Sequence, residues 1–270
     1  MKRAKRNGVT PFVVPALAGP QSTQPSRDRL KPRLQARDGA SSGSEFLLWQ
    51  LADSAFPTGG FAHSAGLEAA WQHGEVRNRV ELLAFLETNL HQLGRAAVPF
   101  MNTAYDEPEQ LAELDQLCDA FLPNHVANRA SRLQGRAFLT AVERIFPERG
   151  QPCPQVHQPR HELADKAVRA PFAHFAPVFG SCLRMLDIPR DTTIRLFYFN
   201  NLRGVLAAAV RLNIVGPMEA QVLQHRLSPL AEEMVARSTL FTLADLAQTA
   251  PLLDLWQGAQ DRLYSRLFQS

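Results

Sequence analysis

The spacing of apolar residues predicts helices through the chain from residue 45 onward. After Asn78 and Glu81, which have the spacing of a capping box, leucines recur at positions 83, 86, 90 and 93, on one face of a helix. Similar stripes predict helices at 45–52, 65–74, 108–123, 124–145, 161–169, 171–187, 191–212, 217–237 and 251–268. No segment after residue 45 alternates with a period of two. We therefore predict an all-α fold, a single globular domain of about ten helices packed as a helical bundle.

The first 45 residues differ in composition from the rest of the chain. They contain five prolines, nine Lys or Arg and three Asp or Glu, so they carry +6 while the remainder carries −3. Such a segment buries too little apolar surface to offset the entropy of ordering, which predicts a disordered basic Pro/Ser-rich tail at 1–45 and an all-α domain at 46–270. The cluster Lys2, Arg3, Lys5 and Arg6 is interpreted as solvated, with an address signal or an anion-binding arm as alternatives.

Cysteine content and hydropathy indicate where the protein works. Cys118, Cys153 and Cys182 are too few for a disulfide framework, which predicts reduced thiols and a cytoplasmic location. The best apolar run, 205–215, is shorter than the roughly 20 residues of a membrane-spanning helix and contains Arg211. The domain shows no basic face, so we expect neither a membrane nor a nucleic acid as partner.

A cluster of helix-breaking residues at 54–60 separates two short apolar-periodic segments. Pro57 fixes its own φ, and either Gly59 or Gly60 can take a positive φ without strain. The flanking Phe56 and Phe61 predict that this turn is attached to a core. Ser64 is the predicted N-cap of the helix near Ala65, which Gly74 would end.

Two groups of residues suggest chemistry, and both signals are weak. Asp53, Ser54 and His63 lack the Gly-x-Ser-x-Gly turn of a hydrolase, so we expect them to cap backbone groups and to pack on the turn. Cys153, His157 and His161 are four residues apart, a spacing that would align metal ligands on a helix, but prolines lie between them. We interpret these three as part of a solvated loop and only as weak metal candidates.

Charged residues on two predicted helices favour surface roles. One face of a predicted helix is basic, with Arg129, Arg132 and Arg136, and we interpret it as solvated or as binding a partner. Gly135 in the same helix indicates close backbone packing or the approach of a partner, since glycine destabilises a helix by about 1 kcal/mol relative to alanine. Glu68 is predicted either to favour the N-terminus of its helix or to lie exposed at a docking surface. The small residues 204 and 207–209 predict helix packing in the core or, alternatively, a dimer seam.

The stretch QLADSAFPTGGFAHSAGLE resembles the N-terminal signature of the urease accessory protein family UreF. Three further blocks occur in the family's order, at 128–139, 174–189 and 197–221. The resemblance covers about residues 46–240; His63 stands where many members carry Tyr. It implies an all-α, non-catalytic maturation factor that dimerises, binds UreD (also called UreH), recruits the GTPase UreG and acts on apo-urease. Nickel and GTP would be handled by these partners, with no cofactor bound directly.

The resemblance also suggests which residues meet partners. We expect the face toward the GTPase and the accessory protein to include Gly59, Gly60, Phe61, His63, Ser64, Glu68, Arg132, Gln134 and Arg136. Arg132 or Arg136 could act as an arginine finger, but pairing with a partner's carboxylate is favoured. Residues 250–270 are expected to become ordered mainly when UreD binds.

Two other functions remain open from the sequence. The first is an all-α enzyme with an apolar pocket, which would need His63 or His174 as a ligand-binding histidine. The second is a chaperone that binds Ni²⁺ directly through Cys153, His157 and His161.

Overall fold

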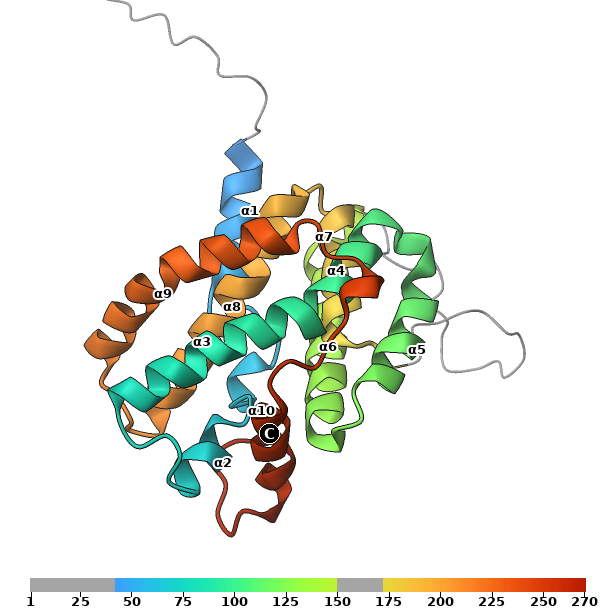
Figure 1. Cartoon of the computed structure of the whole chain (residues 1–270). Coiled ribbons are helices and arrows are strands. Elements are labelled where there is room, and N and C mark those ends of the chain that lie inside the picture. The colour runs from blue at the N-terminus through green and yellow to red at the C-terminus, as the bar shows by residue number, and fades with distance from the viewer. Residues whose placement is uncertain (1–41, 150–171) are drawn as a thin grey trace, which may run out of the picture. The chain divides into compact units, whose positions relative to one another are not determined.

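The computed structural model describes residues 42–149 and 172–270, which lie within one compact unit, residues 41–270 (Figure 1). Every regular element in these residues is a helix, so the all-α prediction is confirmed. The α-helices are α1 (Ser42–Ala52), α2 (Leu67–Gln72), α3 (Arg79–Ala96), α4 (Val98–Asp106), α5 (Leu111–Phe121), α6 (His125–Ile145), α7 (Phe175–Met185), α8 (Arg190–Arg211), α9 (Pro217–Ser238) and α10 (Pro251–Ala259). Short 3-10 helices lie at Gly60–Ala62, Pro108–Gln110, Pro147–Arg149, Leu243–Asp245 and Gln260–Arg262. None of the described helices is long and apolar enough to cross a membrane.

Side-chain caps fix the starts of two long helices where the sequence predicts them. The Asn78 side chain accepts hydrogen bonds from the backbone N–H groups of Val80 and Glu81 at the start of α3. Asn124 does the same for the start of α6. Because an N-cap satisfies donors that have no partner inside the helix, these starts are determined locally.

Aromatic rings and two buried glycines bring the central helices together. Phe138 of α6 packs against Phe179 of α7, with ring centroids 5.1 Å apart. A Cβ on Gly135 would lie 1.9 Å from the carbonyl oxygen of Ala173, and one on Gly180 would lie 2.1 Å from that of Met101. The packing interpretation of Gly135 is therefore confirmed, because only glycine permits this approach of α6 to the backbone before α7.

Two helices are shorter than predicted because tertiary contacts capture their backbone groups. The helix expected from residue 171 begins at Phe175, since the Asp115 carboxylate accepts the N–H groups of Phe172, Ala173 and His174. The helix expected at 251–268 ends at Ala259, and residues 263–270 run without regular structure along α2.

Several predictions concern residues outside the described ranges. They are residues 1–41 of the predicted tail at 1–45, the predicted helix at 161–169, and the metal candidates Cys153, His157 and His161. Cys118 and Cys182 are described as free and buried thiols, and burial raises the pKa of both.

Candidate functional site

The turn before α2 is fixed by its own backbone and by one glycine in the left-handed region. Gly59 has φ +69°, whereas the backbone of Gly60 begins the 3-10 helix Gly60–Ala62. Thr58 Oγ1 accepts the Gly60 N–H at 3.2 Å, and the Gly59 carbonyl accepts the Ala62 N–H at 3.0 Å. The prediction that one of the two glycines takes a positive φ is confirmed.

The two phenylalanines that flank this turn lie in different environments. Phe56 is buried against Phe138, with 5.8 Å between ring centroids. Phe61 is 72% exposed, so the expectation that both rings attach the turn to a core is wrong for Phe61. Arg211 of α8 stacks over the Phe61 ring at 4.6 Å and donates to the Phe61 carbonyl. The ring is therefore both accessible and held in place.

Glu68 is buried, which corrects the expectation of an acid exposed at a docking surface. Its side chain lies inside α2's contact with residues 260–270, and only 1% of the residue is exposed. Oε1 accepts the Leu267 N–H at 2.6 Å, and Oε2 accepts the Phe268 N–H at 3.1 Å and the Gln260 side-chain amide at 2.5 Å. A partner cannot touch this carboxylate while the segment 250–270 is docked.

Ser64 is also buried, and it binds the same segment. Its N–H and its hydroxyl both donate to the Ser270 carbonyl, at 2.5 and 3.2 Å. The N-cap of α2 is Gly66, with φ +85°, and not Ser64, although the Ser64 hydroxyl accepts the Glu68 N–H at 3.4 Å. The helix starts later than predicted because Ala65, with φ +55°, and Gly66 both have left-handed backbone angles, which a right-handed helix cannot include.

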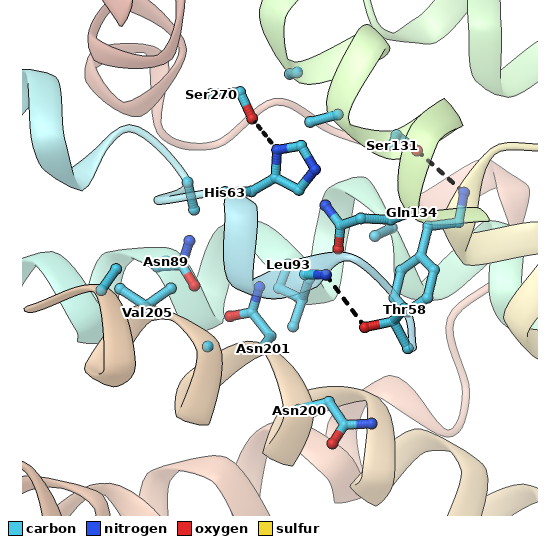
Figure 2. Close-up of a pocket in the computed structure, with 18 of the residues that line it drawn as sticks. Thr58, His63, Asn89, Leu93, Ser131, Gln134, Asn200, Asn201, Val205 and Ser270 are labelled. Carbon is cyan, nitrogen blue, oxygen red and sulfur yellow. Dashed lines mark hydrogen bonds between the residues drawn. The ribbon is translucent and has the colours of Figure 1, made fainter. Parts of the chain in front are cut away.

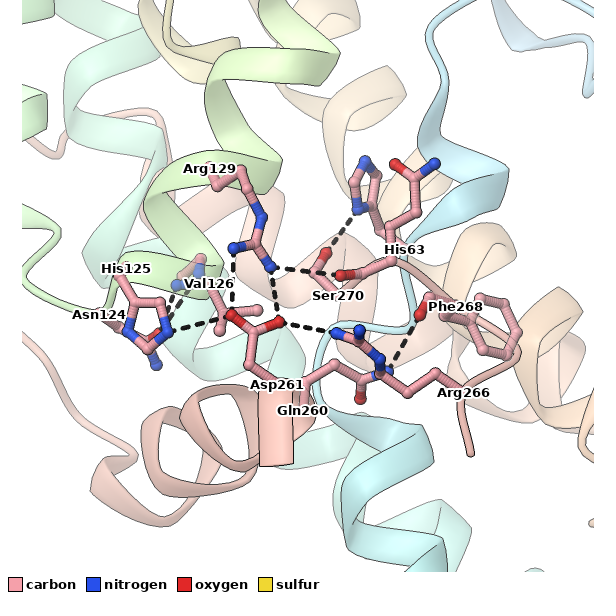
Figure 3. Close-up of polar contacts among 12 residues, drawn as sticks. His63, Asn124, His125, Val126, Arg129, Gln260, Asp261, Arg266, Phe268 and Ser270 are labelled. Carbon is pink, nitrogen blue, oxygen red and sulfur yellow. Dashed lines mark hydrogen bonds and ion pairs between the residues drawn. The ribbon is translucent and has the colours of Figure 1, made fainter. Parts of the chain in front are cut away.

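His63 and Arg129 continue this contact across to α6 (Figure 3). His63 Nδ1 lies 2.5 Å from the Ser270 hydroxyl. Burial, and then the nearby guanidinium of Arg129, lowers the pKa of His63 to about 4, so its ring is neutral at pH 7. Arg129 binds the Asp261 carboxylate with two nitrogens, at 3.0 and 2.8 Å, and the resulting hydrogen bond keeps the pKa of Asp261 below its usual value.

Residues 250–270 are therefore docked in the single chain. Their contacts with Glu68, Ser64, His63 and Arg129 do not agree with the expectation that the segment becomes ordered mainly on binding UreD. The physical reason is that a buried carboxylate and several backbone groups of the body have their hydrogen-bond partners in this segment.

Only some of the α6 residues that are predicted to bind a partner lie beside the turn. A Cβ on Gly60 would lie 3.5 Å from Gln134 Oε1, so Gln134 adjoins the turn. Arg136 is exposed. Arg132 is half-buried instead, with its guanidinium 4.8 Å from the centroid of the Phe172 ring and a nitrogen 3.9 Å from the Asp119 carboxylate. Arg132 thus belongs to an internal contact, which reduces its value as a free finger.

A buried histidine network was missed by sequence reasoning. His174 is fully buried; one ring nitrogen lies 3.1 Å from the Ser131 hydroxyl and the other 3.1 Å from Asp119 Oδ1. Burial lowers the pKa of His174. Both ring nitrogens are engaged, so His174 cannot supply the ligand-binding histidine that the enzyme alternative needs. No local pattern identifies this network, because its residues come from separate parts of the chain. Asp119 lies on α5, Ser131 lies on α6, and His174 is the residue just before α7.

A cavity of about 350 Å³ lies behind the turn, between α3, α6 and α8 (Figure 2). Its walls include Thr58, His63 and Gln134 together with apolar residues of all three helices. Asp53, Ser54 and His63 all line this cavity but do not form a hydrolytic triad: the Ser54 hydroxyl donates to Asp53 Oδ1, whereas His63 Nδ1 lies against the Ser270 hydroxyl. Within residues 42–149 and 172–270, no cluster of three metal-ligating side chains is present.

These features define an all-α protein with an exposed turn, a docked segment and a cavity with both polar and apolar walls, which suits a binding protein. A family model described as UreF matches residues 76–228, more than half of the chain. The chain belongs to the UreF family, which is a family of accessory proteins and not of catalysts.

Named relatives extend the similarity beyond the matched domain. The chain is 40% identical over 222 residues to urease accessory protein F of Oryza sativa subsp. indica, covering 82% of this chain and 83% of the relative. It is 39% identical over 234 residues to urease accessory protein F of Arabidopsis thaliana, covering 86% and 95%. It is 31% identical over 225 residues to urease accessory protein UreF of Mycobacterium tuberculosis, covering 83% and 98%.

Proposed function

We propose that this protein is a non-enzymatic accessory factor in urease maturation that works by binding other proteins. In this proposal it assembles with UreD/UreH and the GTPase UreG on apo-urease in the cytoplasm, as a homodimer, and supports GTP-dependent nickel insertion. Nickel and GTP are handled by the partners. Family membership supports the general role, and the surface of the chain supports the mode of action.

The observation that carries the proposal is the accessible, immobilised ring of Phe61. An exposed aromatic side chain whose position is already fixed loses little conformational entropy on binding, and such residues are frequent binding hot spots. Phe61 lies on the Gly59–Ala62 turn, with Gln134 of α6 beside it. We assign this surface to the GTPase. Arg136 is exposed on α6 but lies two residues from Gln134, on a different face of the helix, so we assign it to the GTPase only as a separate contact.

A second exposed apolar surface fits the other accessory protein. Five large side chains on α2, α10 and the residues after α10 are exposed: Trp71, Leu252, Leu255, Tyr264 and Leu267. The Gln72 side chain donates to the Ser265 carbonyl at 2.8 Å, which ties α2 to this region. We assign this surface to UreD/UreH.

The arginine-finger alternative now concerns Arg136. A finger would supply a factor of about 10³–10⁵ in GTP hydrolysis, whereas pairing with a carboxylate would supply binding only. Single-turnover GTP hydrolysis by UreG with Arg136→Ala, with Arg132→Ala as comparison, separates the two. We expect Arg136→Ala to weaken binding with little change in the rate of the bound GTPase. A lower rate with binding intact would assign the finger.

The test is co-expression of the urease genes with and without this gene, with urease activity and nickel content measured in each. The informative variant is Phe61→Ser, because it changes an exposed side chain and leaves the fold intact. The matched control is Val80→Ser, which removes an exposed apolar side chain at the start of α3. We expect Phe61→Ser to lose UreG co-purification and urease activation, and the control to keep both.

A second substitution, which adds a large side chain at Gly60, also tests the turn. Gly60→Trp places an indole against Thr58 and Gln134. Unchanged UreG co-purification and urease activation by both Gly60→Trp and Phe61→Ser would contradict the assignment of this surface.

Direct nickel binding by Cys153, His157 and His161 is the competing function. Equilibrium dialysis with Ni²⁺, before and after Cys153→Ser, distinguishes it from the scaffold role. We expect no stoichiometric binding that depends on Cys153.

A further inference from the structure

The cavity behind the turn contains hydrogen-bonding groups that the described residues leave unused. Asn89 of α3 is only 8% exposed, and no described residue hydrogen-bonds to its carboxamide. On α8, the Oδ1 atoms of Asn200 and Asn201 are buried without a partner. All three line the same cavity. Burying an unpaired amide oxygen is unfavourable, so these two oxygens, with the unpaired Asn89 carboxamide on the same cavity, indicate that something else pairs with them.

The arrangement of these groups points to a ligand inside the cavity and not at its surface. Figure 2 shows the carboxamides of Asn89 and Asn201 directed toward one another from α3 and α8, beside Leu93 and Val205. The Asn200 side chain also donates to the Leu51 carbonyl at 3.4 Å, so it is partly used. Asn89 and Asn201 are therefore the principal contacts.

The basic side chains of the lining are already engaged. Two acids also line the cavity: Asp53, which accepts the Ser54 hydroxyl and the Ala55 N–H, and Asp254. Arg203 donates to the Ala52 carbonyl, and Arg211 donates to the Phe61 carbonyl. His63 is neutral at pH 7, for the reasons given above. An anionic ligand would find no unengaged counter-charge among Arg203, Arg211 and His63, whereas a neutral ligand avoids the desolvation cost of a buried charge.

We infer that this cavity binds a small neutral molecule with an amide group, whose N–H and C=O pair with Asn89 and Asn201. A carboxamide both donates and accepts, so a second amide is its complement. The volume of about 350 Å³ is within the range of small-molecule sites. This inference concerns a small-molecule ligand and not the proposed protein partners, although Gly60, Phe61 and Gln134 of the surface assigned to the GTPase also line the cavity.

The experiment uses two probes that differ only in the N–H group. Saturation-transfer NMR on the full chain compares 2-pyrrolidinone with cyclopentanone, at concentrations up to about 50 mM, because six-atom ligands commonly bind in the millimolar range. We expect a saturable signal from 2-pyrrolidinone and roughly tenfold weaker binding of cyclopentanone, which leaves the carboxamide oxygens unpaired.

Three variants locate the binding. Asn89→Leu and Asn201→Leu keep the side-chain size and remove the carboxamide. Gly204→Leu blocks the space instead: Gly204 lines the cavity, and a Cβ there meets no atom within 4 Å, so α8 tolerates the larger residue. Gln221→Leu, on the exposed face of α9, is the matched control. We expect the first three to reduce 2-pyrrolidinone binding at least tenfold and the control to leave it unchanged.

Three outcomes would overturn the inference. Equal binding of both probes would mean that shape alone is recognised. No signal from either probe would mean that the cavity is filled by water. Undiminished binding in Gly204→Leu, which does not depend on the asparagines for folding, would place the probe elsewhere. Loss of binding in Gly204→Leu while the Phe61→Ser and Val80→Ser results stand would leave the proposed function unaffected.

Discussion

Replacing Glu68 by Gln should release the segment 250–270 while the helical body stays folded. The carboxylate accepts three hydrogen bonds from this segment, two of them from the backbone N–H groups of Leu267 and Phe268. Glutamine keeps one acceptor oxygen and replaces the other by a donor, so at least one buried N–H loses its partner. The change keeps the volume of the side chain, so no cavity forms.

The expected size of the effect follows from the kind of hydrogen bond that is lost. A hydrogen bond to a charged group contributes about 1.5–3 kcal/mol, and leaving its partner buried and unpaired adds to the loss. We expect the closed state of the segment to lose about 2–4 kcal/mol, which is roughly a 30- to 1,000-fold increase in its open population.

Amide hydrogen exchange measures this local opening directly. The amides of Leu267 and Phe268 should exchange faster by that factor, whereas those of α3 and α8 should not change, because sub-global opening is independent of global unfolding. Glu87→Gln is the control, since Glu87 is an exposed acid on α3. Unchanged exchange at Leu267 and Phe268 in folded Glu68→Gln would refute the reasoning.

Three further predictions concern two glycines and one histidine. Gly135→Ala should destabilise the protein by several kcal/mol, on the order of a severe core clash, because its Cβ would lie 1.9 Å from the Ala173 carbonyl oxygen; chemical denaturation measures this. Gly204→Ala, with open space around its Cβ, should be neutral or stabilise by up to about 1 kcal/mol in the same assay. His63 has its pKa lowered from 6.5 to about 4 in the folded state, so the unfolded chain binds the proton first: stability is fully present above pH 6.5 and is lost as the pH falls toward 4. Denaturation midpoints between pH 7 and 4 should fall less in His63→Gln than in the parent, and parallel curves would contradict this assignment.

The sequence by itself determined the helices and their local signals. Asn78 and Asn124 cap α3 and α6 as predicted, and Gly59 takes the positive φ that the turn requires. These features depend on residues within a few positions of one another, so the sequence contains the whole interaction. Gly135 is intermediate: its cost in a helix indicated a close approach, but not to which backbone.

Only the tertiary structure decided the roles of Glu68, Ser64 and His174. Glu68 and Ser64 are polar and near a turn, which locally favours exposure, yet both are buried because residues near position 270 complete their hydrogen bonds. Their partners lie about 200 positions along the chain, and His174 joins two other helices. Whether a polar side chain is buried depends on which distant groups satisfy it, and neither composition nor periodicity contains that pairing.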